Sequence, residues 1–258
     1  YKSKFVVQIF VSLLLVYGGC RIGNLGGLFG IHTVPVAVGA VLTVLVCVLL
    51  MNAYNLIDGI DGLCSGLSLL TLGALGIWFT WNNLYVYGIM VAGIVGVVSV
   101  FFFYNVSGNR MKIFMGDTGS LTLGYLIAFF GLKFYNMNVE TAMFNTPAAP
   151  AAPAAPAVFL GMVFIPVFDT IRVFFVRIKA GLSPFYPDKR HIHHKMLRLG
   201  LNHFQSSMTI IFMQACFVVL NVLLKDININ ILFFLDLILG FIMIYVIDLL
   251  GKRNKKLV

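Results

Sequence analysis

Eight long apolar runs divide this chain of 258 residues and constrain its fold more than any other feature. They cover residues 5–19, 34–51, 66–81, 85–104, 120–135, 157–176, 207–224 and 229–250. A segment that crosses a bilayer must satisfy its own backbone hydrogen bonds, and long unbroken runs favour helices over the alternating strands of a membrane β-barrel. The sequence therefore predicts an all-α, polytopic transmembrane bundle of about eight helices.

The composition supports this class. Hydrophobic residues make up 60% of the chain and charged residues only 10%, whereas a soluble protein is roughly 45–50% apolar and about 25% charged. These proportions exclude a disordered chain, a coiled coil, collagen and a secreted disulfide scaffold. The four cysteines stand singly, without Cys-x-x-Cys spacing, so the sequence indicates neither a zinc site nor a redox pair.

Basic residues are distributed unevenly between the two sides that eight alternating spans define. One side holds both termini and the segments 52–65, 105–119 and 177–206. Of the 18 Lys and Arg residues, 15 lie on or next to this side and only three lie opposite: Arg21, Lys133 and Lys225. Short cytoplasmic loops are enriched in basic residues, so we expect the first side to face the cytoplasm. This topology and anionic membrane lipids account for the net charge of +9, and nucleic acid is not an expected partner.

A three-residue repeat of proline and alanine occupies residues 147–156, on the predicted external side. Proline fixes an extended backbone with few hydrogen bonds, so we interpret this segment as a linker. Nothing else in the sequence indicates a second domain. Residues 1–258 are therefore expected to form a single integral-membrane domain.

The first of three polar clusters lies at the end of the second apolar run. Its members, spaced by three, are Asn52, Asn55, Asp58 and Asp61. On a helix this spacing covers half of the circumference, which can line a concave polar site. Ionisable groups at a membrane boundary are costly and indicate function. The alternative is that the two aspartates are simply solvated in a loop.

The second cluster, residues 112–120, opens the fifth apolar run. Asp117 is followed by small residues at the expected start of a helix. It is either a helix cap or a carboxylate that holds Mg²⁺, so that the metal and the helix start together receive phosphate oxygens. Of this cluster, Asp117 is the residue for which we predict a function.

The third cluster, residues 183–195, contains His191, His193 and His194. Three histidines in four residues suggest a zinc or copper site, but the nearby Lys189, Arg190, Lys195 and Arg198 repel a cation and suit an anion. We therefore favour phosphate recognition over metal binding or a plain basic loop. Arg177 and Lys179, just upstream, can help to clamp a diphosphate.

Carboxylates, amides and basic groups on one membrane face outline a magnesium-dependent phosphoryl or phosphoglycosyl transfer site. Two other classes remain open. A secondary transporter places its ionisable residues at mid-membrane in repeated halves, and neither feature is evident here. A non-catalytic membrane fragment of an enzyme is the second alternative.

Three longer motifs carry a resemblance to a known family. They read NAYNLIDGIDGL at 52–63, KIFMGDTGSLTLGY at 112–125 and GLSPFYPDKRHIHHKMLRLG at 181–200. In this order they resemble the polyprenyl-phosphate N-acetylhexosamine-1-phosphate transferases, of the glycosyltransferase family 4 type. They look most similar to the bacterial undecaprenyl-phosphate N-acetylglucosamine-1-phosphate transferases that begin O-antigen (lipopolysaccharide), enterobacterial common antigen or teichoic acid synthesis.

The resemblance implies a reaction in which undecaprenyl phosphate attacks the β-phosphate of a UDP-HexNAc, most simply UDP-GlcNAc, and releases UMP. It implies Mg²⁺, with Mn²⁺ as a substitute, and a multi-pass protein of the bacterial cytoplasmic membrane whose catalytic face is cytoplasmic. The sequence distinguishes neither UDP-GlcNAc from other UDP-HexNAc donors nor direct attack from an aspartyl intermediate.

The resemblance also implies roles for individual residues. Asp117 and Asn55 are the implied metal ligands. Asp58 and Asp61 would orient the substrate or metal-bound water. The implied substrate-binding residues are Asn52, Lys112, Phe114, Arg177, Lys189 and Arg190. Phe114 can stack on uracil or be an ordinary apolar loop residue. His191, His193 and His194, together with Arg177, would hold the diphosphate as charge develops on UMP.

The chain departs from the family pattern at its start. Family members carry an Asp-Asp pair before a segment that corresponds here to Lys4–Gln8. We therefore expect N-terminal helices of the family domain to be missing, which puts the activity of this chain alone in doubt. Lys189 stands where arginine is commoner, which keeps the charge but loses the bidentate fork. Asp169 and Arg172 are as well explained by an ion pair or a helix-end contact as by catalysis.

Overall fold

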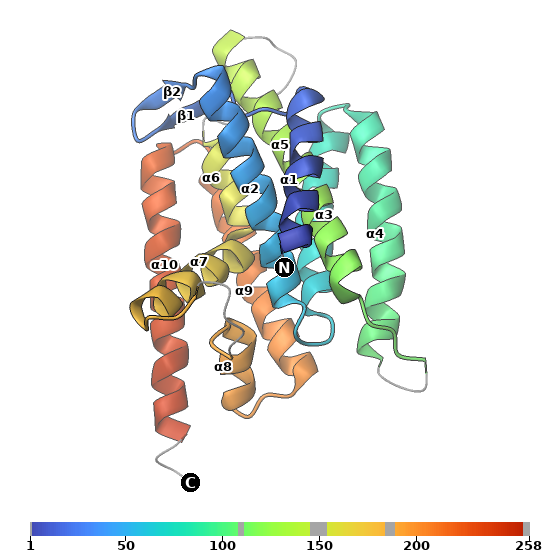
Figure 1. Cartoon of the computed structure of the whole chain (residues 1–258), viewed down its shortest axis with the longest axis vertical. Helices are drawn as coiled ribbons and strands as arrows, with labels where there is room; N and C mark the ends of the chain where they lie inside the picture. Colours follow the sequence, from blue (N-terminus) through green and yellow to red (C-terminus); the bar gives the residue numbers. More distant parts are fainter. Residues whose placement is uncertain (1, 108–110, 145–153, 184–188, 255–258) are drawn as a thin grey trace.

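The computed structural model of the chain describes residues 2–107, 111–144, 154–183 and 189–254 (Figure 1). The described helices are α1 Lys2–Tyr17, α2 Val36–Ile57, α3 Leu63–Trp81, α4 Tyr85–Val106, α5 Gly116–Phe144, α6 Ala155–Met162, α7 Phe164–Lys179, α8 Ile192–Arg198, α9 His203–Leu223 and α10 Ile229–Asn254. One short antiparallel hairpin, β1 Asn24–Leu28 and β2 Ile31–Thr33, joins α1 to α2. The predicted all-α fold class is confirmed.

Fewer helices than predicted meet the requirements of a membrane span. Within the described ranges, α2, α3, α4, α9 and α10 are long and apolar enough to cross a bilayer, and α6 with α7 can count as a sixth span. The shorter α1 and the more polar α5 occupy the other two predicted runs and are not among these candidates. Length and hydropathy therefore support five or six spans instead of eight.

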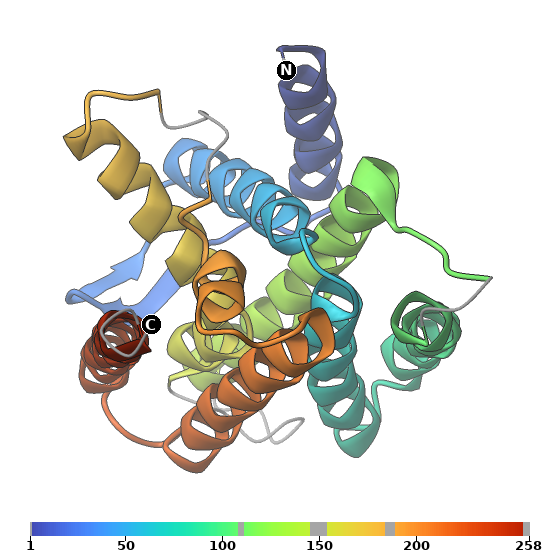
Figure 2. The same cartoon turned by 90° about the horizontal axis from the view of Figure 1, so that it is seen from below.

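Helices α2 and α5 pack together in the interior of the bundle, as the view from below shows (Figure 2). Their closest approach is at Gly124 of α5, where a Cβ atom would lie 2.6 Å from the Cα of Met51. Small residues let membrane helices approach backbone to backbone. This contact brings the first turn of α5 next to the last turns of α2, where the first two polar clusters lie.

The predicted span over 157–176 is broken into two helices. Helices α6 and α7 meet at an angle of 80°, and α7 runs across the bundle in Figure 1. Pro166 explains the break, because its ring would clash with the carbonyl of Met162 in a continuous helix.

Two side chains from other helices stabilise this break. Thr71 of α3 donates to the Met162 carbonyl (2.8 Å). Gln214 of α9 donates to the Gly161 carbonyl (2.7 Å) and accepts from the Ile165 amide (2.8 Å). Backbone groups freed inside a membrane protein need such partners. The break is therefore stabilised by specific side-chain contacts within the fold.

The hairpin and α8 lie at opposite ends of the molecule, at the top and bottom of Figure 1. Residues 147–153 of the predicted linker lie outside the described residues. Ala155 and Pro156 belong to α6, so the predicted end of the linker was wrong there. Proline is well suited to the first turn of a helix because it lacks only an N–H that the helix leaves unpaired.

Candidate active site

The first cluster is only partly helical. Helix α2 ends at Ile57, so Asn52 and Asn55 are on the helix, whereas Asp58 and Asp61 lie in the turn that joins α2 to α3. The expectation that all four residues share a helical face was therefore wrong. The turn ends at Gly62, whose φ of +76° is a conformation that glycine adopts without strain.

Asn105, near the end of α4, ties this turn to the segment before α5. Its side-chain oxygen accepts from the Gly62 amide (2.6 Å), and its nitrogen donates to the Ile113 carbonyl (2.8 Å). Asn105 was not predicted as a functional residue, although an amide at the end of an apolar run could have indicated one. The first two polar clusters are thus joined by this side chain.

Asp61 is held by residues from two other elements. Lys112 Nζ lies 2.5 Å from Asp61 Oδ2, and His203 Nδ1 lies 3.3 Å from the same oxygen. Ser207 donates to the Asp61 backbone carbonyl (2.6 Å). His203 and Ser207 are on α9, and neither was predicted, because the sequence gives no sign of which face of α9 meets the turn.

Asp117 lies in the first turn of α5, where a carboxylate is favoured by the helix dipole. It forms an ion pair with Lys4 of α1, and Asn55 donates its amide to Asp117 Oδ1 (2.9 Å). These hydrogen bonds, first that of Lys4 and then that of Asn55, hold the pKa of Asp117 below its usual value. No function was predicted for Lys4 from the sequence, where it appeared only as the first residue of the segment Lys4–Gln8.

Asp58 has no hydrogen bond or ion pair in the described part of the chain. Its pKa is raised to about 6, first by burial and then by the negative charges of Asp117 and Asp61. We call Asp58, Asp61 and Asp117 the carboxylate cluster. Burial and these two neighbouring carboxylates both disfavour a negative charge on Asp58, and a bound cation would relieve the second of these effects.

The carboxylate cluster fits Mg²⁺ better than a transition metal. The described residues contain no group of three or more His, Cys, Asp or Glu side chains arranged as a metal cage. Mg²⁺ needs no such cage, because it is usually held by one or two carboxylates, water and substrate phosphates. Asn55 presents its amide nitrogen to Asp117, so it can become a ligand only if the amide rotates.

Residues of α7 hold the third polar cluster in place. His191 Nδ1 lies 2.8 Å from Asp169 Oδ2, and His191 Nε2 lies 3.4 Å from a guanidinium nitrogen of Arg177. Asp169, Arg177 and His191 are each at most 3% exposed. Asp169 also pairs with Arg172 (2.6 Å), which confirms the expected ion pair, and accepts from the backbone amide that follows His191 (3.1 Å).

His193 is buried next to these residues, and we call Asp169, Arg177, His191 and His193 the histidine cluster. The pKa of His193 is lowered to about 3, first by burial and then by the neighbouring histidines. Its Nδ1 atom is buried and has no hydrogen-bond partner. The ring of His194 lies 4.2 Å from that of His193. A neutral imidazole with an unsatisfied nitrogen is suited to receive a ligand.

The two clusters meet at Gly59. A Cβ atom at this position would lie 2.6 Å from His193 Nε2, so the turn that carries Asp58 lies directly against α8. In Figure 2, α8 lies between α10 and α9, at the end of the bundle where the turn emerges. Residues from α2, α5, α7 and α8 are thereby brought to one site.

The remaining predicted residues lie around this centre with different partners. Asn52 donates to Gln8 of α1 (2.8 Å) and to the Val48 carbonyl (2.7 Å), so its amide nitrogen already has two partners. Phe114 is 76% exposed, with Lys112 Nζ 5.3 Å from its ring centre. Lys189 is exposed, and Arg190 donates to the Val176 carbonyl (3.4 Å). Residues 184–188 of the third cluster lie outside the described residues.

Two cavities flank the start of α5. One, of about 520 Å³, lies between α1 and α5 and is lined by Lys4, Gln8 and Asp117 at its polar end. The other, of about 640 Å³, lies between α4 and α5, is almost entirely apolar and includes Phe114. The first cavity therefore connects an apolar surface with Asp117, whereas the described lining of the second includes the neighbouring Thr118 but no residue of the carboxylate cluster.

Comparison with known proteins gives consistent similarities. Residues 1–135 match the description of glycosyl transferase family 4. The chain is 33% identical to a probable undecaprenyl-phosphate N-acetylglucosaminyl 1-phosphate transferase of Bacillus subtilis, over 60% of this chain and 40% of that protein. It is 32% identical to an undecaprenyl-phosphate alpha-N-acetylglucosaminyl 1-phosphate transferase of Pasteurella multocida, over 48% of this chain and 31% of that protein. The chain thus matches well under half the length of these relatives.

Proposed function

The chain belongs to glycosyl transferase family 4, and we propose that it carries the UDP-sugar and metal half of a polyprenyl-phosphate N-acetylhexosamine-1-phosphate transferase. The reaction is transfer of a HexNAc-1-phosphate, in the first instance GlcNAc-1-phosphate, from its UDP-sugar to undecaprenyl phosphate with release of UMP. The relatives' names support the GlcNAc donor and the polyprenyl acceptor.

One observation carries this proposal: Gly59 places the carboxylate cluster against His193, so that groups for a cation and groups for an anion line the same site. A diphosphate bound to a divalent metal needs both. A secondary transporter needs neither arrangement, and its ionisable residues would lie at mid-membrane.

Asp58 and Asp117 would hold Mg²⁺, which supplies charge neutralisation for the diphosphate when it is bound. Lys4 then exchanges its contact with Asp117 for the incoming phosphate of the lipid, which can approach through the cavity between α1 and α5. Asp61, fixed by Lys112 and His203, orients groups next to the metal.

The exposed ring of Phe114 can stack on uracil, and Lys112 beside it can contact the nucleotide. Arg177 and His191, buried and mutually oriented, provide fixed donors for the diphosphate as negative charge develops on UMP. His193 and His194 extend this donor set towards the carboxylate cluster. Lys189 and Arg190 add positive charge at the edge of the site.

We place this site on the cytoplasmic face of a bacterial inner membrane, because UDP-sugars are cytoplasmic and the basic residues Lys4, Lys112 and Arg177 lie at the site itself. The product would enter cell-envelope polysaccharide synthesis.

The test is Mg²⁺-dependent transfer of labelled GlcNAc-1-phosphate to undecaprenyl phosphate, with UMP measured as the second product. The chain is assayed alone and with a family-type Asp-Asp segment added before Lys4. If only the extended chain is active and EDTA abolishes this activity, the proposal is supported and the chain alone is incomplete. Failure of both folded proteins with several UDP-HexNAc donors contradicts it.

A further inference from the structure

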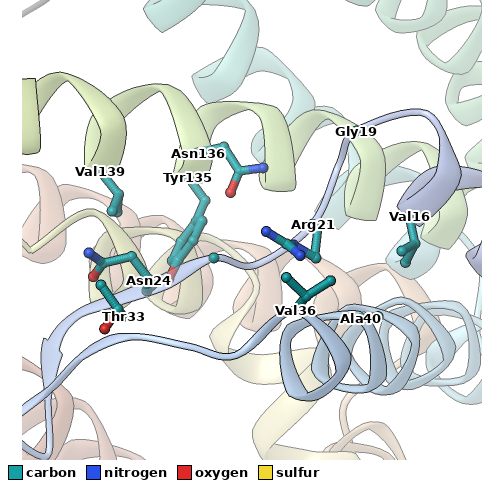
Figure 3. Close-up of a pocket in the computed structure, with 11 residues that line it drawn as sticks. Val16, Gly19, Arg21, Asn24, Thr33, Val36, Ala40, Tyr135, Asn136 and Val139 are labelled. Atoms are coloured by element: carbon teal, nitrogen blue, oxygen red, sulfur yellow. Dashed lines mark hydrogen bonds between the residues drawn. The ribbon is translucent and has the colours of Figure 1, made fainter.

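A third cavity lies at the end of the molecule opposite the candidate active site. It has a volume of about 490 Å³ and lies between the end of α1, the hairpin and the external ends of α2 and α5 (Figure 3). Among the described residues that line it, Arg21 is the one that carries a charge. The side chain points into the cavity, between Asn136 of α5 and Val36 of α2.

Among the described residues, Arg21 differs from Arg172 and Arg177 in that its side chain has no partner. Arg172 and Arg177 are bound to Asp169 and His191, whereas Arg21 has no ion pair or side-chain hydrogen bond within the described ranges. It is only partly exposed. A guanidinium carries five donors in a fixed fork, and leaving them without an acceptor in a partly buried place is unfavourable.

The rest of the lining is divided into a polar and an apolar part. Asn24, Thr33 and Asn136 contribute amide and hydroxyl groups on the side of the hairpin and α5. Val36 and Ala40 of α2 contribute apolar surface, and Val36 is 68% exposed. The apolar part continues directly onto the outer surface of a membrane-spanning helix.

We propose that this cavity binds the anionic head group of a membrane phospholipid. The phosphodiester occupies the fork of Arg21, and head-group hydroxyls contact the amides of Asn24 and Asn136. An acyl chain then follows the exposed side of α2 from Val36. The position supports a lipid over a soluble anion, because the cavity lies at the ends of the spans, at the level of the bilayer's phosphates.

This site is independent of the proposed transferase reaction. The described residues that line it include no carboxylate, and it lies at the other end of the bundle. Its expected effect is structural, because a lipid held there joins four elements: α1, the hairpin, α2 and α5. Lipid binding to the folded state raises the melting temperature by mass action.

The test compares the detergent-purified chain with phosphatidylglycerol, phosphatidylcholine or inorganic phosphate, reading bound lipid by native mass spectrometry and the melting temperature. We expect phosphatidylglycerol to be retained and to raise the melting temperature. Arg21→Gln should weaken its retention about tenfold, the loss of one charge-assisted contact. Lys225→Gln removes a basic residue on the same side but outside the cavity lining, and should retain the lipid as the wild type does.

A second variant keeps the proposal testable if Arg21→Gln fails to fold. Asn136→Asp adds a carboxylate that can pair with Arg21, so it should abolish phosphatidylglycerol retention while keeping the lipid-free melting temperature. Equal retention by the wild type and both cavity variants overturns the proposal. So does an equal rise in melting temperature with inorganic phosphate alone, or retention of phosphatidylcholine as strong as that of phosphatidylglycerol.

Discussion

The carboxylate cluster and the histidine cluster meet at Gly59 but are held in opposite ways. Asp117 has a side chain that is 59% exposed and is neutralised by a lysine from another helix. Asp169 and His191 are at most 3% exposed and are bound to each other and to two arginines. The comparison indicates that one half of the site is pre-organised by the fold, whereas the other is left open for ions and substrates that bind from solution.

This difference predicts that the two clusters respond differently to mutation. Asp117, the exposed member of the carboxylate cluster, should affect activity with little effect on stability, because its side chain is 59% exposed. Residues of the histidine cluster should affect activity and stability together. The predictions below begin with the largest expected effect and refer to the extended, active chain.

Asp117→Asn should nearly abolish transfer, by about 4 kcal/mol or roughly a thousandfold, because it removes the charge that holds the metal. Its melting temperature should stay close to that of the wild type, since the side chain is exposed. Asp248→Asn is a matched control, because Asp248 forms an exposed ion pair with Lys195 away from the carboxylate cluster. Near-normal Mg²⁺-dependent turnover of Asp117→Asn would remove this residue from the metal site.

Asp169→Ala should lower both activity and stability. It leaves Arg172 and the amide of Ile192 without their buried acceptor, and breaking such a pair typically costs about 3 kcal/mol or more. The activity should fall about a hundredfold through misplacement of His191. Unfolding in denaturant and the transfer rate are measured on the same preparation. A variant with full stability and lost activity would contradict the division between the two clusters.

Gly59→Ala tests the contact between the clusters directly. The added methyl group would lie 2.6 Å from His193 Nε2, so the turn and α8 must move apart. We expect kcat to fall about tenfold with little change in stability, since small displacements at a reaction centre have large effects on rate. Gly73→Ala, with nothing within 4 Å of the added atom, is the control and should be neutral. Equal rates for both variants would show that the contact does not matter.

The two clusters also differ in how far the sequence could predict them. The histidines and the carboxylates are local motifs, so residue type and spacing were enough to single them out as candidates. Asn105, His203 and Gln214 were missed because their roles depend on helices that are distant in the sequence and adjacent only in the fold. The break between α6 and α7 was predictable from Pro166, but the continuous hydrophobicity of residues 157–176 concealed it.

The smallest predicted effect concerns pH and Asp58, the member of the carboxylate cluster that has no hydrogen bond or ion pair among the described residues. Because the pKa of Asp58 is raised to about 6 in the folded chain from 3.8, the folded state binds more protons than the unfolded state between these values. The free energy of unfolding of the metal-free chain should therefore fall as pH rises from 4 to 6, and this contribution should be constant above pH 6. Asp58→Asn should remove this part of the pH dependence, which denaturant unfolding at several pH values measures as a difference between the two proteins.

Mg²⁺ should have the same effect as the mutation, since a bound cation offsets the charges of Asp117 and Asp61 that raise this pKa. If the difference in pH dependence between the two proteins is the same with and without Mg²⁺, the cation does not bind at the carboxylate cluster.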